Sequence, residues 1–298
     1  MVSARVTPCY MSPIPTRPVV GKRSRRRSST SERHEIMAEH SSAPRYGFLI
    51  DVSLCIDCRS CMVACSVENE VPMHSTRIWI KETGVTGTFP DLQRFTGPYH
   101  CMHCVDPSCV SACTVSALQR NEDGIVTYDR DVCIGCRYCM YACPFEVPNY
   151  EWEEALPLVV KCDMCFARLQ EGQQPACATT CPTGAIKFGK YEDMLNEAYR
   201  LIEENPGKYV NHIYGETENG GTATLYISPV PFEELGFPIA GTTSTAFSNR
   251  LVTEGTPLVA GAMLVGLSGV YLTIKHQKEE AEAERREAEQ QKAAGEEE

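Results

Sequence analysis

Apolar residues along the chain form three short runs and one helical stripe. The runs cover residues 46–52 (YGFLIDV), 125–128 (IVTY) and 185–188 (AIKF), and their length and β-branched content are those of strands. Between residues 191 and 204, apolar side chains recur on one helix face, and a Pro-Gly pair follows. The pattern therefore predicts short strands and one amphipathic helix packed on the domain.

The most apolar segment lies near the C-terminus. Residues 257–274 (PLVAGAMLVGLSGVYLTI) carry no charge, and at about 1.5 Å per residue they would extend roughly 27 Å. This length is near the lower limit for crossing a bilayer core of about 30 Å, and a buried helix of a soluble domain is the alternative. Because a charged tail follows at 276–298, we favour a transmembrane anchor over residues 251–275.

The first 44 residues show no apolar periodicity. They are rich in Pro, Ser and Arg and contain the basic run KRSRRR at 22–27, a composition typical of disordered segments. A twin-arginine export signal needs an apolar stretch after its basic block, whereas Ser and Thr follow this one. We predict a disordered basic tail over residues 1–44, with Met37 as an alternative start.

The net charge of the chain indicates which kind of molecule it can bind. The formal net charge is −11, which argues against a nucleic-acid-binding protein. An acidic surface suits a domain that meets a protein partner.

Cysteine is the residue that decides the chemistry. The chain has 17 cysteines, and all but Cys9 fall into four quartets. The quartets are Cys55, Cys58, Cys61 and Cys65; Cys101, Cys104, Cys109 and Cys113; Cys133, Cys136, Cys139 and Cys143; and Cys162, Cys165, Cys177 and Cys181.

The spacing of these cysteines points to [4Fe–4S] clusters. The first and third quartets match the C-x2-C-x2-C-x3-C run of bacterial ferredoxins, in which the fourth cysteine ligates the other cluster of a pair. Pro144 and Pro182 follow the fourth cysteines of their quartets, as in that signature. Sixteen thiols for sixteen irons predict four [4Fe–4S] clusters, with all sixteen cysteines as iron ligands.

Zinc and disulfides are the competing uses of so many cysteines. Structural zinc sites use two separated pairs of cysteine or histidine ligands, whereas here three cysteines follow one another at intervals of three, which is one more than such a pair. Disulfide scaffolds belong to short secreted chains. The sequence has no nucleophile–base constellation and no nucleotide-binding glycine motif, and four thiols per cluster leave no open iron. We therefore expect no catalytic residue and no enzymatic activity in this chain itself.

The quartets and the C-terminal helix resemble the four-cluster ferredoxin-like subunits of membrane-bound bacterial oxidoreductases. The resemblance lies in residues 100–113, 131–148, 175–189 and 212–238. It is nearest to the iron–sulfur subunit of periplasmic, quinone-linked NiFe hydrogenases, and next to the formate dehydrogenase beta subunit. It implies an α+β fold with two ferredoxin-like modules over residues 45–190, one nested in the other, and a helix with a partner-docking segment over 191–250.

The resemblance also implies which cysteines share a cluster, although spacing alone leaves sequential pairing of neighbouring quartets open. In the family, the first quartet pairs with the fourth, and the second with the third. The implied ligand sets are Cys55, Cys58, Cys61 and Cys181; Cys162, Cys165, Cys177 and Cys65; Cys101, Cys104, Cys109 and Cys143; and Cys133, Cys136, Cys139 and Cys113.

The function implied is electron transfer between two partners. One is a catalytic large subunit, either a NiFe hydrogenase or a molybdopterin enzyme, and the other is a polytopic membrane cytochrome b or quinone-reactive subunit. Lys275, His276 and Lys278 after the anchor predict a cytoplasmic tail and a periplasmic cluster domain at the bacterial inner membrane. The alternative function is a free-standing, membrane-tethered ferredoxin or redox-sensing binding module.

Five further residues carry expectations about their surroundings. Lys161 and Arg137 lie beside predicted iron ligands and could raise cluster potentials, although a solvated surface cation is the favoured interpretation of both. We expect His103 to be a neighbour of a cluster or a surface residue rather than a ligand. Trp79 and Trp152 are expected in the core.

Overall fold

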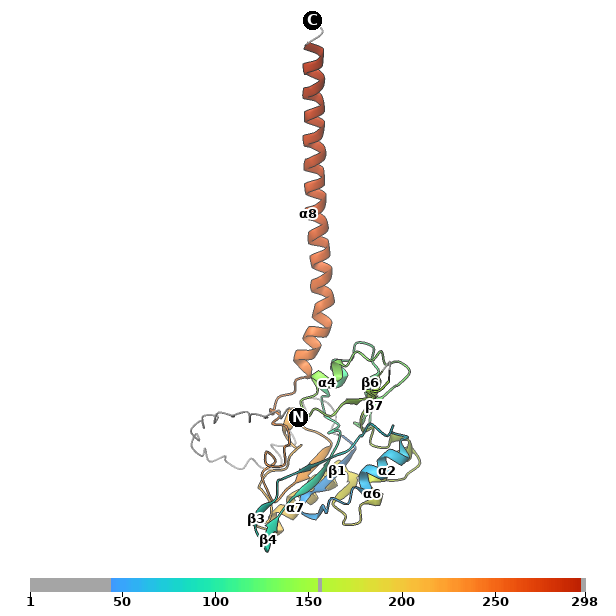
Figure 1. Cartoon of the computed structure of the whole chain (residues 1–298), viewed down its shortest axis with the longest axis vertical. Coiled ribbons are helices and arrows are strands. Elements are labelled where there is room, and N and C mark those ends of the chain that lie inside the picture. The colour runs from blue at the N-terminus through green and yellow to red at the C-terminus, as the bar shows by residue number, and fades with distance from the viewer. Residues whose placement is uncertain (1–43, 155–156, 296–298) are drawn as a thin grey trace, which may run out of the picture. The chain divides into compact units, whose positions relative to one another are not determined.

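The computed structural model describes residues 44–154 and 157–295 (Figure 1). The disordered tail predicted over residues 1–44 and the alternative start at Met37 lie outside the described residues, apart from Pro44.

The described part of the chain alternates short strands with short helices. The strands are β1 (Tyr46–Asp51), β2 (Trp79–Glu82), β3 (Thr86–Thr88), β4 (Asp91–Gln93), β5 (Thr96–Tyr99), β6 (Leu118–Arg120), β7 (Val126–Tyr128), β8 (Asn149–Tyr150), β9 (Val159–Val160), β10 (Ile186–Lys190) and β11 (Thr224–Ile227). The α-helices are α2 (Ser60–Glu68), α3 (Ser108–Ser111), α4 (Tyr138–Ala142), α5 (Phe166–Gln170), α6 (Ala176–Thr180), α7 (Tyr191–Glu204) and α8 (Ala246–Gly295). Two 3₁₀ turns are η1 (Val52–Leu54) and η2 (Glu218–Gly220).

A three-stranded sheet organises the domain around its first strand. β1 pairs antiparallel with β10, with Ile50 opposite Ile186, and parallel with β11, with Phe48 opposite Thr224. Five of the six β1 residues are buried, which is the pattern of a strand covered on both faces. All three predicted strands are present, as β1, β7 and β10.

Helix α7 covers this sheet as its apolar stripe predicts. It contacts β1, β10 and β11, and it ends at Glu204, just before the Pro-Gly pair. Ala198 is fully buried, and Met194 and Leu201 are partly buried beside it. The helix is therefore part of the packed domain.

The remaining strands form two-stranded hairpins rather than one larger sheet. β2 pairs with β5, β3 with β4, β6 with β7, and β8 with β9. Cysteines contribute to two clusters of buried apolar residues, including Cys61 and Cys104 in one and Cys109 and Cys139 in the other. Because thiols occupy positions that aliphatic side chains normally fill, we expect cluster binding to be coupled to folding.

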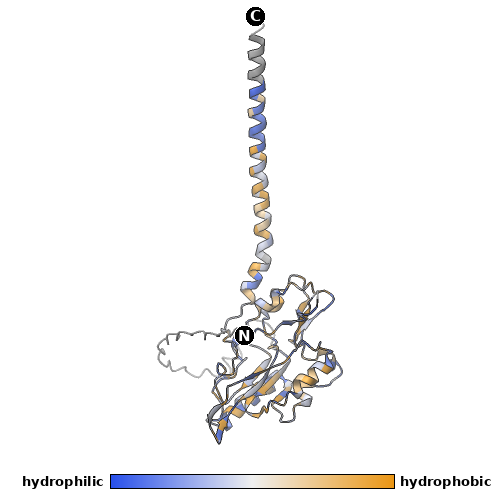
Figure 2. Cartoon of the chain, in the orientation of Figure 1, coloured by the Kyte–Doolittle hydropathy of each residue, from blue (hydrophilic) through white to orange (hydrophobic). Residues whose placement is uncertain are grey.

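Helix α8 contains the predicted apolar segment and extends beyond it at both ends. It is long and apolar enough to cross a membrane, and Figure 2 shows the hydrophobic band along it, followed by hydrophilic residues. Its first turns contact α3, where Arg250 donates two hydrogen bonds to the Asp106 carboxylate at 2.9 and 3.0 Å. Just before the helix, Ser244 Oγ donates to the same carboxylate at 2.9 Å.

Candidate iron–sulfur centres

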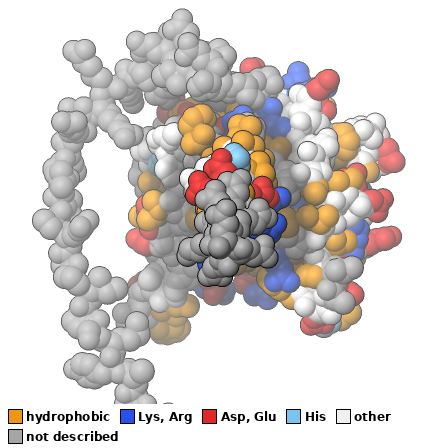
Figure 3. All heavy atoms as spheres, turned by 90° about the horizontal axis from the view of Figure 1, so that it is seen from above, with side chains coloured by type: hydrophobic (Ala, Val, Ile, Leu, Met, Phe, Trp, Pro, Cys, Tyr) orange, Lys and Arg blue, Asp and Glu red, His pale blue; other side chains and the backbone are white. Residues whose placement is uncertain are grey.

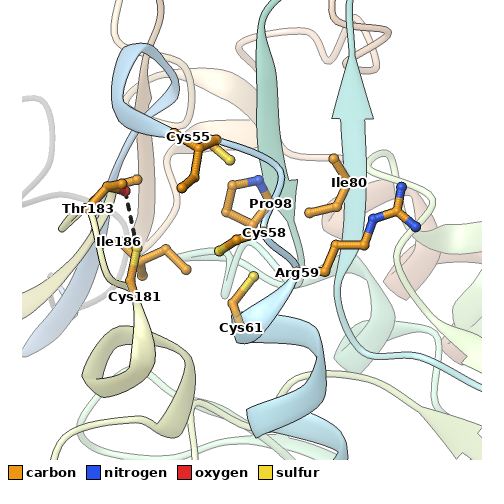
Figure 4. Close-up of a pocket in the computed structure, with 11 residues that line it drawn as sticks. Cys55, Cys58, Arg59, Cys61, Ile80, Pro98, Cys181, Thr183 and Ile186 are labelled. Carbon is orange, nitrogen blue, oxygen red and sulfur yellow. Dashed lines mark hydrogen bonds between the residues drawn. The ribbon is translucent and has the colours of Figure 1, made fainter.

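Cysteines from the first and fourth quartets line one pocket. Cys55 and Cys58 lie in the loop before α2, Cys61 lies in α2, and Cys181 follows α6. The two helices are in contact, and Figure 4 shows the four side chains around a common space. The pocket has about 330 Å³ of open space. Two segments more than a hundred residues apart in the sequence thus meet at one site.

A second pocket brings together cysteines of the second and third quartets. It is lined by Cys133, Cys136, Cys139 and Cys113, with about 310 Å³ of open space. Its walls include Leu118 of β6, Tyr128 of β7 and Tyr150 of β8. The Tyr150 hydroxyl lies 3.3 Å from the Cys139 sulfur. The pocket therefore lies against the two small hairpins.

The other eight cysteines lie deeper in the domain. The Asn69 side-chain amide reaches the sulfurs of both Cys65 and Cys165, at 3.6 and 3.9 Å. Burial raises the pKa of the Cys104 thiol well above its usual value, and the neighbouring Cys143, Cys109 and Cys101 thiols raise it further. Thiols of different quartets are therefore close enough to interact.

The donor set fits iron–sulfur clusters. Among the residues described, no three His, Cys, Asp or Glu side chains are arranged to hold a single metal ion. The thiols are instead spaced around pockets, as a cube with four separate irons requires. Burial raises the pKa of Cys61 to about 11, of Cys65 to about 12 and of Cys143 to about 11. Such thiols ionise at neutral pH only when a cationic partner such as iron binds them.

The backbone of the four cysteine loops shares a turn that spacing alone did not reveal. The residue before the second cysteine has a positive φ in every quartet: 54° at Asp57, 47° at His103, 67° at Gly135 and 60° at Met164. Left-handed backbone is uncommon outside glycine. Only Gly135 is a sequence signal for it, so three of the four turns could not be recognised from the residue type.

This turn directs backbone amides at the first sulfur of the loop. Gly135 N–H donates to Cys133 Sγ at 3.4 Å, and Met164 N–H donates to Cys162 Sγ at 3.3 Å. Such hydrogen bonds to sulfur stabilise negative charge on a cluster and raise its potential.

A buried histidine provides an independent observation. His103 is fully buried, and its Nδ1 accepts a hydrogen bond from Val126 N–H at 3.1 Å. The proton of the neutral ring is therefore on Nε2, which has no partner among the described residues. An unsatisfied buried donor is uncommon, and this one belongs to the loop between Cys101 and Cys104. A cluster at that loop would supply sulfur acceptors.

The structure corrects two expectations about the surroundings of single residues, those for Lys161 and Trp152. Lys161 is buried, so the interpretation as a solvated surface cation is wrong. The Arg137 guanidinium lies 4.6 Å from the centroid of the Trp152 ring. Trp152 is 53% exposed rather than in the core, whereas Trp79 is partly buried in β2.

Family models and known proteins resemble the chain over its cysteine-rich part. Residues 92–191 and residues 48–114 each match a model described as a 4Fe-4S dicluster domain. A protein of Nitratidesulfovibrio vulgaris is 40% identical over 266 residues, covering 84% of this chain and 72% of that protein. The hydrogenase-2 operon protein HybA of Escherichia coli O157:H7 is 36% identical over 263 residues, covering 73% and 80%. The nitrate-inducible formate dehydrogenase iron-sulfur subunit of Escherichia coli K12 is 37% identical over 200 residues, covering 60% and 66%.

The fold and the cysteine sites together define a ferredoxin-like electron-transfer protein with four [4Fe–4S] clusters. The chain belongs to the family of iron–sulfur subunits that includes HybA and the formate dehydrogenase iron–sulfur subunits. The family inferred from the quartets, its cofactor and its role as an electron relay are confirmed.

Proposed function

We propose that this chain carries electrons between a catalytic subunit and a membrane-embedded cytochrome or quinone-reactive subunit of one bacterial oxidoreductase complex. The catalytic partner is a NiFe hydrogenase or a molybdopterin enzyme, and no substrate is converted in this chain. The observation that carries the proposal is the pocket in which Cys181 joins three cysteines of the first quartet. A relay needs clusters that lie close together in one domain. The shared pocket of Cys181 and the first quartet brings the two ends of the cysteine-rich region together.

We assign four ligand sets, so that one ferredoxin-like module is nested in the other. The two pockets support the assignment of Cys181 to the first triplet and of Cys113 to the third. The Asn69 amide between Cys65 and Cys165 supports the third set. The Cys143 thiol, which raises the pKa of the Cys104 thiol, supports the fourth. The sets are Cys55, Cys58, Cys61 and Cys181; Cys133, Cys136, Cys139 and Cys113; Cys162, Cys165, Cys177 and Cys65; and Cys101, Cys104, Cys109 and Cys143.

Exposure of the cysteines divides these four sets into two outer and two inner clusters. Among the sixteen, only Cys58 and Cys136 are exposed, and each belongs to one of the two pockets. All four cysteines of the Cys65 set are buried, as are three of the four in the Cys104 set. We call the clusters with an exposed cysteine outer and the other two inner. Electrons enter and leave through the outer clusters.

The two outer clusters meet different partners. The Cys136 set is the outer cluster closer to the anchor, because α4, which carries Cys139, contacts α3, and α3 contacts the start of α8. We assign this end to the membrane subunit and the Cys58 end to the catalytic subunit. Exposed Ile56 and Ile134 occupy equivalent positions in the two loops and provide apolar contact surface at both ends. Elsewhere, as on the face in Figure 3, hydrophobic and charged side chains are interspersed.

Helix α8 anchors the complex at the inner membrane, with the cluster domain on the periplasmic side. Its apolar stretch supports the anchor. Lys275, His276 and Lys278 at its C-terminal end support a cytoplasmic tail.

Capture of the chain from membranes tests this proposal. Membranes are extracted in mild detergent, the complex is captured through this chain, and the co-purifying proteins are identified by mass spectrometry. We expect a NiFe or molybdopterin large subunit and a polytopic membrane protein. Recovery of this chain alone, with four reducible clusters, would overturn the assignment to a complex and leave a free-standing tethered ferredoxin.

A further inference from the structure

A buried lysine lies where the two inner ligand sets approach each other. Lys161 is 3% exposed, and its ammonium donates to the backbone oxygens of Val126 at 2.7 Å and Cys162 at 2.6 Å. Both distances are short, as in charge-assisted hydrogen bonds. No carboxylate of the described residues forms an ion pair with it. A buried cation without a counter-ion is strongly unfavourable. Lys161 therefore needs an anionic neighbour that is not a carboxylate side chain.

The contacts of Lys161 connect it to both inner sets. It directly precedes Cys162, a ligand of one inner cluster. It also reaches the loop of the other set, because Val126, whose carbonyl accepts from Lys161, donates its N–H to His103, which lies between Cys101 and Cys104. A [4Fe–4S] cluster with four thiolates carries net negative charge and gains one more on reduction. Two such clusters are anions that offset the burial of this ammonium.

Val126 joins Lys161 to the buried histidine. Its carbonyl accepts from Lys161, and its N–H donates to His103 Nδ1. Because His103 Nδ1 accepts this hydrogen bond, the buried ring presents its proton on Nε2, which has no partner among the described residues. A cation and a neutral donor are therefore held by one strand residue of β7, between the inner sets.

We propose that the charge of Lys161, assisted by the His103 N–H, raises the reduction potentials of both inner clusters. Reduction adds negative charge, and a fixed cation in a poorly solvated interior stabilises the reduced state of each neighbour. Without it, each inner cluster would feel mainly the negative charge of the other, and both would be harder to reduce. Lys161 thereby keeps the middle of the relay accessible to electrons from either end. This inference rests on the proposed ligand sets.

The test is a potentiometric EPR titration of the intact detergent-solubilised complex carrying Lys161→Gln. The glutamine amide retains two N–H donors for the two carbonyls but removes the charge. We expect four loaded clusters, lower potentials for both inner clusters and unchanged potentials for the outer pair. Lys161→Arg should stay near the wild type. Lys187→Gln is the matched control, because it removes a lysine charge that is paired with Glu197 near the surface, and it should move no potential.

The inner signals are identified beforehand as those lost in Cys104→Ser and Cys177→Ser. Unchanged inner potentials in a fully loaded Lys161→Gln complex would overturn the inference and leave the ligand sets intact. If those two serine variants remove the same signal, the proposed ligand sets fail instead. If Lys161→Gln loses clusters, Lys161→Arg decides: restored loading and potentials support the role of charge, and equal loss in the arginine variant contradicts it.

Discussion

The outer and inner cysteine sets proposed for this domain differ in how they meet solvent. Each outer set has an exposed cysteine, Cys58 or Cys136, and an exposed isoleucine in the same loop. Seven of the eight cysteines in the inner sets are buried, and a buried cation, Lys161, donates to the backbone of one of them. Under the proposed assignment, the outer clusters would exchange electrons with the partners, whereas Lys161 would tune the inner clusters from within the chain.

The largest expected effect is the loss of an inner ligand. Cys104→Ser replaces a buried thiol that contributes to the core and to cluster binding. Because metal binding is coupled to folding, we expect loss of that cluster and destabilisation of the domain by about 3 kcal/mol or more. Thermal unfolding and iron content of the purified complex measure both effects. A variant with three clusters and unchanged thermal stability would contradict the view that this inner cluster stabilises the fold.

Cys136→Ser at the outer set should separate electron flow from folding. Its thiol is exposed, so we expect a folded domain that lacks or alters one cluster. Electron transfer to quinone should fall roughly tenfold or more, a barrier increase of about 1.4 kcal/mol, while the catalytic partner still reduces an artificial dye. Quinone and dye assays on the same preparation check this. Unaltered quinone reduction would contradict the in-line relay.

Substitutions at the two equivalent isoleucines should distinguish the two ends. Ile134 is 62% exposed and Ile56 is 65% exposed, and both lie directly after the first cysteine of their loops. Ile134→Asp should weaken association with the membrane subunit roughly tenfold, and Ile56→Asp should do so with the catalytic subunit. Each variant is the control for the other. If both variants release the same partner in co-purification, the two ends are assigned wrongly.

The smallest expected effect concerns the Asn69 amide. It lies near two sulfurs of one inner set, and Arg77 donates to its Oδ1 at 3.0 Å. Asn69→Leu removes donors that favour the reduced cluster, so its potential should fall by on the order of tens of millivolts. Asn69 also donates to the Cys65 carbonyl at the end of α2. Asn205→Leu is the control, because Asn205 donates in the same way to the Leu201 carbonyl at the end of α7. Equal potentials in the wild type and the Asn69 variant would show that these long N–H···S contacts do not affect the reduction potential of the cluster.

The sequence by itself determined the features that depend on neighbouring residues. Ligand spacing within a triplet is local, so the quartets identified the cofactor and the family before any fold was known. Periodicity is local as well, which is why 191–204 was recognised as a helix and 46–52 as a strand.

Only the tertiary structure decided what depends on distant segments. Cys181 lines a pocket with Cys55, Cys58 and Cys61 because α2 contacts α6 and β1 pairs with β10, and no local pattern encodes such a pairing. Burial of Lys161 and exposure of Trp152 were misjudged for the same reason, since the exposure of a side chain is set by the elements that pack around it. The left-handed turns at Asp57, His103 and Met164 are likewise imposed by the assembled loops, against the preference of these residue types.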